Sequence, residues 1–144
     1  MTGEQRSIGK LSKETGVKVP TIRFYEQIGL LPPARRTEGD WRLYGDDARR
    51  RLDFIRHARD LGFSVDDIRG LLAVAAHPEA PCADADTITR AQLAAVTRKI
   101  EQLMTLRDEL RRMADVCAGG PAADCRIIEA LSERTLCEGH AISP

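Results

Sequence analysis

Apolar residues recur three and four positions apart over a long stretch in the second half of the chain. The apolar or small residues of this series are Leu93, Val96, Ile100, Leu103, Leu110, Ala114 and Cys117. Arg107 interrupts the series once. The spacing is typical of a coiled-coil seam, in which one face of a helix packs against a second helix. Residues 84–116 contain no Pro or Gly, so the pattern predicts one uninterrupted helix there.

A helix of this length needs a partner. At a rise of 1.5 Å per residue it would be about 50 Å long, which is more than a small domain can cover. A second copy of the chain is the natural cover, so we predict a homodimer. If the two helices pair antiparallel, the start of one helix lies beside the end of the other. Cys82 would then approach the partner subunit's Cys117 and the partner subunit's Cys125, and the pattern indicates a thiolate site at the interface.

The front of the chain carries shorter helical patterns separated by Gly and Pro. Ser7 is expected to cap a helix that runs to about Thr15. Pro20 fits the first turn of a second helix over residues 21–28, which Gly29 terminates. Two short helices joined by a turn that contains Gly make a helix-turn-helix, whose second helix enters the major groove of DNA.

The second of these helices divides its residues between an inner and an outer face. Ile22, Phe24 and Ile28 are expected to supply the apolar contacts. Arg23 and Tyr25 would then point outward and reach DNA. Short helix pairs also occur in proteins that bind no DNA, so the spacing alone leaves both alternatives open.

A basic and aromatic segment follows. Residues 35–44, RRTEGDWRLY, predict a wing of two short strands with a turn between them. Arg36 and Arg42 on such a ribbon are suited to phosphate contact, or they are solvated surface arginines. Trp41 and Tyr44 are either hydrogen-bonding partners of DNA or core residues, and the sequence alone leaves both alternatives open.

Two more helices complete the front half. Asp46 is expected to cap a helix of about 15 residues. Ser64 and Asp67 are spaced for a capping box that opens another helix over residues 65–75. Arg56 lies on the first of these helices, where it reaches phosphate or is an ordinary surface arginine.

Charge and composition narrow the class of protein. Residues 1–70 carry 14 Lys and Arg against 11 Asp and Glu, a balance of +3, and residues 71–144 carry 8 against 11, a balance of −3. A basic front half fits a module that meets a polyanion. The 144-residue chain has no nucleotide-binding glycine pattern and no recognisable Ser/His/Asp arrangement, so an enzyme is not expected.

The chemical role of the cysteines depends on the cellular compartment in which the protein works. The sequence has no apolar run of about 18 residues and no secretory signal, so we expect a cytoplasmic protein with no membrane contact. In a reducing cytoplasm the four cysteines are metal ligands, redox groups or inert core residues rather than disulfides. Three thiolates would favour a soft metal ion over a hard cation.

Four motifs carry a resemblance to a known family. They are TIRFYE at 21–26, GLLP at 29–32, RLY at 42–44 and ARDLGFS at 58–64. Together they closely resemble the MerR family of bacterial metal-responsive transcription regulators, over residues 8–131. The chain departs from the family pattern at the wing tip, where Asp40-Trp41 stands in place of the more frequent Gly-Tyr.

The resemblance implies a mainly α-helical homodimer: a winged helix-turn-helix, then a long antiparallel coiled-coil dimerisation helix and a short metal-binding loop. Such regulators sit on double-stranded promoter DNA with an overlong spacer. Metal binding makes them bend and untwist the promoter so that RNA polymerase can read both of its elements. By the match, the DNA contacts would be Arg23, Tyr25, Arg36, Arg42 and Tyr44, with Arg56 as a further candidate.

The resemblance also bears on the metal. Copper(I) and silver sensors of the family look to have Ser at the position of Cys82, whereas sensors of divalent ions have Cys there. The chain therefore resembles the divalent subgroup, with cadmium, lead, mercury or zinc as the inducer bound by Cys82, Cys117 and Cys125. The loop lacks the extra Cys and His of the paired zinc sites. Cys137 and His140 are a possible secondary site or an incidental pair.

The sequence leaves other functions open. A copper(I) or silver sensor would use Cys117 and Cys125 only, and a thiol redox sensor would join the same two cysteines in a disulfide. The cysteines are otherwise small buried core residues, and a small-molecule sensor would need a larger C-terminal domain. The expected divisions are a DNA-binding domain at 1–76, a hinge at 77–83, a dimerisation helix at 84–116, a metal-binding loop and short helix at 117–131, and a flexible tail at 132–144.

Overall fold

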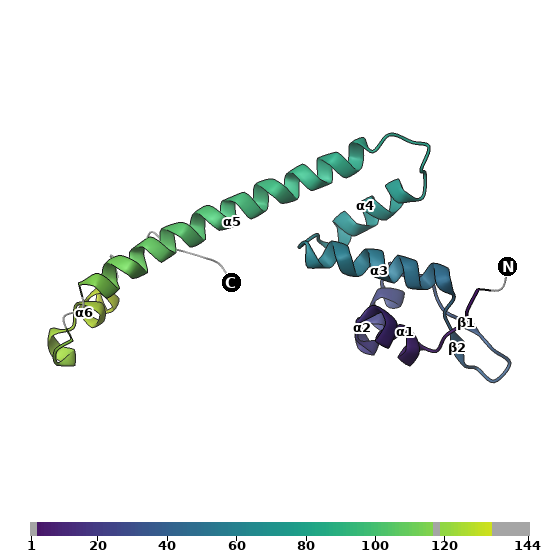
Figure 1. Ribbon diagram of the computed structural model, residues 1–144, viewed down its shortest axis with the longest axis horizontal. Helices are drawn as coiled ribbons and strands as arrows, with labels where there is room; N and C mark the ends of the chain where they lie inside the picture. Colours follow the sequence, from purple (N-terminus) through teal and green to yellow (C-terminus); the bar gives the residue numbers. More distant parts are fainter. Residues whose placement is uncertain (1–2, 117–118, 134–144) are drawn as a thin grey trace. The chain divides into compact units, whose positions relative to one another are not determined.

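The computed structural model describes residues 3–116 and 119–133. Its elements in chain order are α1 (Ile8–Thr15), α2 (Val19–Gln27), β1 (Arg35–Arg36), β2 (Arg42–Leu43), α3 (Asp46–Asp60), α4 (Val65–Ala75), α5 (Ala83–Asp115), the 3-10 turn η1 (Ala122–Asp124) and α6 (Arg126–Ser132) (Figure 1). The predicted mainly helical fold, with a winged helix-turn-helix followed by a long helix, is confirmed. The chain forms two compact units, Met1–Thr89 and Arg90–Pro144. The finer division into five segments stays a prediction.

Local signals set the first two helices. The Ser7 hydroxyl accepts a hydrogen bond from the backbone N–H of Lys10 at 3.2 Å, as an N-cap residue does. Gly16 ends α1 at φ 75°, a left-handed conformation that a residue without a Cβ adopts at no steric cost. Pro20 lies in the first turn of α2, which begins at Val19 and thus two residues earlier than predicted.

The prediction that Asp46 caps α3 is wrong. The N-cap residue is Gly45, which has no side chain to offer, and Asp46 is the first helical residue. The carboxylate of Asp46 instead accepts a hydrogen bond from Nη2 of Arg6 at 2.8 Å. A charged hydrogen bond to a buried guanidinium is stronger than a cap, so the distant partner determines the conformation of Asp46.

The capping box of α4 is confirmed. The Ser64 hydroxyl accepts from the backbone N–H of Asp67 at 3.1 Å, and the Asp67 carboxylate accepts from the backbone N–H of Ser64 at 3.2 Å. We expect Ser64→Ala to lower the free energy of unfolding by about 1 kcal/mol. Urea denaturation followed by circular dichroism measures this change. Ser12→Ala, in the middle of α1, is the control and should stay within about 0.5 kcal/mol of wild type.

The core of the first unit lies between the four short helices. Its fully buried aliphatic residues are Leu11, Ile22, Leu30, Leu31, Leu52, Ile55 and Ile68. They come from α1, α2, the segment after α2, α3 and α4, so each of these elements has one face fixed by packing. The opposite face of α2 is left on the surface.

The wing is a small antiparallel sheet beside this core. β1 and β2 pair with Arg35 opposite Leu43 and Arg36 opposite Arg42. The N-terminal segment adds a bridge next to β2, because the backbone of Arg6 and that of Tyr44 exchange two hydrogen bonds of 2.9 and 2.8 Å. The wing is therefore tied to the segment that leads into α1.

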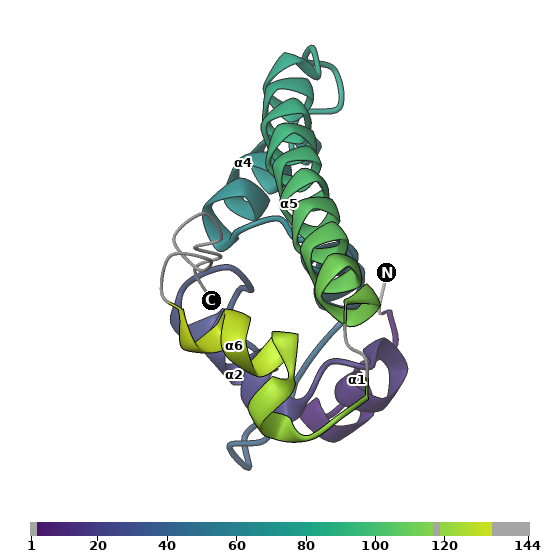
Figure 2. The same cartoon turned by 90° about the vertical axis from the view of Figure 1, so that its left-hand side faces the viewer.

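The long helix α5 spans 33 residues, and its ends lie one residue from the predicted ones. Figure 2 shows it as one unbroken helix. Its beginning belongs to the first unit and packs on α4: a Cβ placed on Gly70 would lie 2.8 Å from Cδ1 of Ile88. Gly is unfavourable inside a helix, so its place in α4 is explained by this close approach.

The apolar series of α5 is exposed in the single chain. Leu93, Ile100, Leu103 and Leu110 are between 51% and 62% exposed, and no residue of α5 is buried. Among the described residues, no helix combines the length and the apolar character that crossing a membrane requires.

Candidate functional site

The outer face of α2 carries a cation and an aromatic ring. The side chain of Arg23 is exposed, and no ion pair or side-chain hydrogen bond engages it within residues 3–116 and 119–133. Phe24 is 49% exposed, whereas Tyr25 is only 7% exposed and belongs to the core. The prediction that Phe24 packs inside and Tyr25 points outward is therefore wrong.

The helical period explains this reversal. At 100° per residue, Tyr25 lies 60° from the buried Ile22 on the helix surface, whereas Phe24 lies 160° away from it. Tyr25 also anchors the end of the helix, because its carbonyl oxygen accepts from the backbone N–H groups of Leu30 at 2.9 Å and Leu31 at 3.1 Å. The angular positions were available from the sequence, and they place Phe24 beside Arg23 on the outer face.

At the wing, one carboxylate of α2 binds Arg42 of β2 and Tyr44, which follows β2. The hydroxyl of Tyr44 donates to Oε1 of Glu26, and Nη1 of Arg42 lies 3.4 Å from Oε2 of the same carboxylate. Tyr44 is 1% exposed, and its burial together with Glu26 raises its pKa to about 12. The assignment of Tyr44 as a DNA contact is thus corrected to a core residue that links the wing to α2. Glu26 was not singled out from the sequence.

The tip of the wing is exposed. Nη1 of Arg36 forms an ion pair with Oδ1 of Asp40 at 2.6 Å, and Asp40 adopts φ 63° at the turn. This carboxylate raises the pKa of Arg36. Trp41 is 74% exposed, so it is not the core residue that the sequence left open. Arg36, Arg42 and Trp41 thus remain on the surface of one small ribbon.

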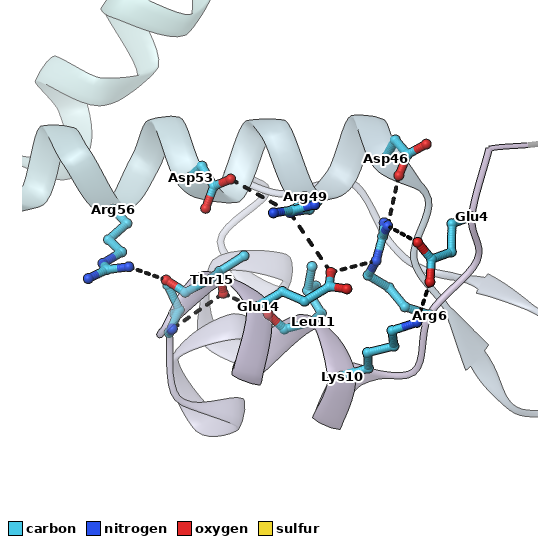
Figure 3. Close-up of polar contacts among 11 residues, drawn as sticks. Glu4, Arg6, Lys10, Leu11, Glu14, Thr15, Asp46, Arg49, Asp53 and Arg56 are labelled. Carbon is cyan, nitrogen blue, oxygen red and sulfur yellow. Dashed lines mark hydrogen bonds and ion pairs between the residues drawn. The ribbon is translucent and has the colours of Figure 1, made fainter.

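Several arginines of the front half serve the fold. Arg51, Arg56, Arg59 and Arg69 donate hydrogen bonds to the carbonyl oxygens of Leu30, Thr15, Phe63 and Ile28, respectively. These carbonyls lie at or just beyond the ends of helices, where the backbone has no intrahelical donor. Figure 3 shows Arg56 of α3 reaching the end of α1. Its predicted phosphate contact remains a prediction.

Arg6 is the most deeply buried charge of the described chain. Its residue is 2% exposed, and its Nη2 and Nε lie 2.8 Å from Asp46 and 2.7 Å from Glu14 (Figure 3). The contact with Glu14 is an ion pair without the alignment of a hydrogen bond. The guanidinium joins α1 to the start of α3 and lowers the pKa of Asp46. Nothing in the local sequence marks Arg6 as a buried residue.

Four cations of the front half form no ion pair and donate no side-chain hydrogen bond within the described residues. They are Lys13, Lys18, Arg23 and Arg35. They come from α1, the residue before α2, α2 and the wing. All four are exposed. These elements can therefore meet a polyanion without first breaking an internal ion pair.

The predicted metal ligands are only partly within the described structure. Cys82 is exposed directly before α5, and Cys125 is partly buried directly before α6. Cys117, Cys137 and His140 lie outside the described residues. The described part of the chain holds no cluster of three or more His, Cys, Asp or Glu placed to bind a metal ion. The predicted site combines ligands from two subunits, so one chain does not test it.

A winged helix-turn-helix with an exposed cation on its second helix, followed by a long helix with an apolar face, defines a DNA-binding regulator. Comparisons with known proteins agree. Residues 6–74 match the family model described as MerR HTH family regulatory protein, and residues 49–113 match the one described as MerR, DNA binding. The chain belongs to the MerR family, whose members are regulators and not enzymes.

Relatives match along almost the whole chain. Heavy metal-dependent transcription regulator 2 of Rhizobium meliloti (strain 1021) is 38% identical, over 96% of this chain and 94% of its own. The regulator ZntR of Escherichia coli (strain K12) is 40% identical, over 88% and 92%.

Solved structures are also similar. PbrR691 from Ralstonia metallidurans CH34, in complex with lead(II), gives a TM-score of 0.76 at 36% identity, over 88% of this chain and 98% of that one. MerR from Bacillus megaterium MB1, in complex with mercury(II), gives 0.68 at 31% identity, over 89% and 100%.

Proposed function

We propose that this protein is a metal-responsive transcription regulator that activates metal-resistance genes from double-stranded promoter DNA. It binds the promoter as a homodimer in the cytoplasm, where it meets RNA polymerase. A divalent soft metal ion binds Cys82 of one chain together with the partner subunit's Cys117 and the partner subunit's Cys125. When the ion is bound, the dimer distorts the promoter DNA so that RNA polymerase can use it.

The exposed apolar face of α5 supports the homodimer. Leu93, Ile100, Leu103 and Leu110 follow a coiled-coil spacing and are all more than half exposed in the single chain. An exposed apolar stripe of this kind marks an interaction surface. Antiparallel pairing of two copies of α5 covers the stripe in both chains.

The DNA-binding side chains come from α2 and the wing. Arg23 is exposed on α2, and Arg36 and Arg42 stand on the paired strands. Glu26 holds the wing to α2 through Tyr44 and Arg42, so the two DNA-binding elements keep a fixed mutual position. A fixed pair of elements is suited to adjacent grooves and the phosphates between them.

The presence and position of Cys82 are the reasons for proposing a divalent ion as the inducer. It is exposed and directly precedes α5, so its thiolate is available for a metal that also binds a second subunit. Three thiolates suit cadmium, lead, mercury or zinc, and a linear copper(I) or silver ion would need only two. Relatives solved with lead(II) and mercury(II) support a divalent inducer.

We expect Cys82→Ser to reduce metal-dependent transcription at least tenfold, because the site loses one of its three thiolates (an estimate that corresponds to about 1.4 kcal/mol). The measurement is in vitro transcription from the protein's promoter under reducing conditions, titrated with cadmium, lead, mercury, zinc and copper(I). Cys137→Ser is the matched variant, and it should keep the full response.

Three other results would change the assignment. Activation by copper(I) alone that is indifferent to Cys82 would identify a copper(I) or silver sensor. Silence with every metal but a response to oxidant would favour the thiol redox sensor. Loss of the response in Cys137→Ser would bring Cys137, and with it His140, into the metal site.

A further inference from the structure

Phe24 places an apolar ring on the outer face of α2, the face that is proposed to bind the polyanion DNA. Half of its side chain is exposed, whereas Ile22 and Tyr25 of the same helix are buried. Among the described residues of α2, Phe24 is the large apolar residue that is exposed. Exposing the apolar surface of a phenyl ring to water costs free energy in proportion to its area. A contact that covers the ring therefore contributes to binding.

The ring of Phe24 is held in place. It contacts the ring of the buried Tyr25 with 6.0 Å between centroids and an angle of 47° between planes. Tyr25 in turn is fixed by the core and by the chain that follows α2. Phe24 loses little conformational freedom when it binds a partner, since its side chain has only two rotatable torsions.

Phe24 directly follows the exposed Arg23 in α2, and Arg23 has no ion pair or side-chain hydrogen bond within the described residues. A surface that combines a free guanidinium with a phenyl ring fits a partner with polar acceptors and an apolar group close together. The major groove of DNA presents this combination, because guanine offers two acceptors and thymine offers a 5-methyl group. The remaining base edges are polar and would lose hydrogen bonds to water against a phenyl ring.

We propose that Phe24 contacts the 5-methyl group of a thymine in the promoter and thereby makes the protein select a T·A pair at that position. The inference rests on the proposed function and names a base-reading residue for it. Arg23 then supplies the polar contact and Phe24 the apolar one. Trp41, the exposed aromatic residue of the wing, lies in the turn between β1 and β2 and not on α2, so it has no part in this contact.

The test removes single methyl groups from DNA. The full-length protein first selects its binding site from a pool of random duplexes. Each thymine of the selected duplex is then replaced in turn by deoxyuridine, which lacks only the 5-methyl group. Affinities are measured for wild type, Phe24→Ala and the control Trp41→Ala, after circular dichroism confirms that all three fold alike.

The expected result is specific to one position in each half-site. There, deoxyuridine weakens wild type about fourfold, the effect of one buried methyl group. Phe24→Ala is insensitive to the same replacement, and Trp41→Ala keeps the wild-type sensitivity. Phe24→Leu, which keeps an apolar contact, should retain part of the sensitivity.

Two results would overturn the inference alone. One is an equal loss on deoxyuridine replacement in wild type and Phe24→Ala at every thymine. The other is weaker binding by Phe24→Ala with no dependence on any methyl group, which would mean that the ring touches sugar or stacks on a base. If wild type selects no duplex at all, the proposed function itself fails, and that outcome is distinguishable from both.

Discussion

Arg23→Ala is expected to weaken promoter binding about 10- to 100-fold, because a good arginine contact with a base edge contributes roughly 1–3 kcal/mol. The side chain is exposed on α2 and has no partner within the described residues, so its removal does not disturb the fold. Fluorescence anisotropy with a labelled promoter duplex at fixed salt, with and without metal, measures the loss.

The control for this variant is Arg98→Ala, an exposed arginine on α5. It should bind the promoter like wild type. A loss in Arg23→Ala that occurs only with metal would mean that Arg23 acts in the switch rather than in binding. A loss that is equal for promoter and unrelated DNA would show that Arg23 contacts phosphate instead of a base.

Arg6→Leu is expected to lower the free energy of unfolding by roughly 2 kcal/mol, since it removes a hydrogen bond between charged groups while the carboxylates left behind stay partly exposed to water. The change deprives Glu14 and Asp46 of the cation that joins α1 to α3. Urea denaturation at neutral pH measures it. Arg50→Leu is the matched control: its guanidinium pairs with Asp47 on the surface, and its loss should change stability by less than about 1 kcal/mol.

The pH dependence gives a second readout of the same contact. Arg6 lowers the folded-state pKa of Asp46 below its ordinary value of 3.8. The stabilisation is therefore present above that value and is lost as the pH falls through the lowered folded-state pKa. Arg6→Leu should flatten this acid-side decline of stability. An unchanged decline would show that other carboxylates cause it.

Local signals allowed much of the fold to be predicted. Ser7 and Ser64 cap helices as their spacing indicated, because a cap needs only residues within one turn. The absence of Pro and Gly gave α5 to within one residue. The exception is Asp46, whose carboxylate is taken by Arg6, forty positions earlier in the chain. A contact over that separation leaves no trace in the local pattern.

The residues of the candidate site also divide into those that the local sequence predicts and those that depend on distant contacts. Arg23, Arg36 and Arg42 lie on the surface of α2 and the wing as predicted, since charged residues stay near water. The reversal of Phe24 and Tyr25 was accessible from the helical angle and was missed because both rings are apolar. Glu26 was not accessible, because its partner Tyr44 is 18 positions away. The thiolate site joins two subunits, so its geometry depends on a contact that one chain does not contain.

Because several arginines donate hydrogen bonds to helix ends, fewer cations are free to displace counterions from DNA. Of the 14 Lys and Arg in residues 1–70, four form no ion pair and donate no side-chain hydrogen bond within the described residues. An arginine that leaves a carboxylate or a carbonyl to meet a phosphate exchanges one contact for another and gains little. The number of sodium or potassium ions released from the duplex on binding then depends chiefly on the four cations of each subunit that form no such internal contact. A chain rich in arginine thus competes with salt for DNA only modestly, and discrimination among promoters falls to the few side chains that touch the bases.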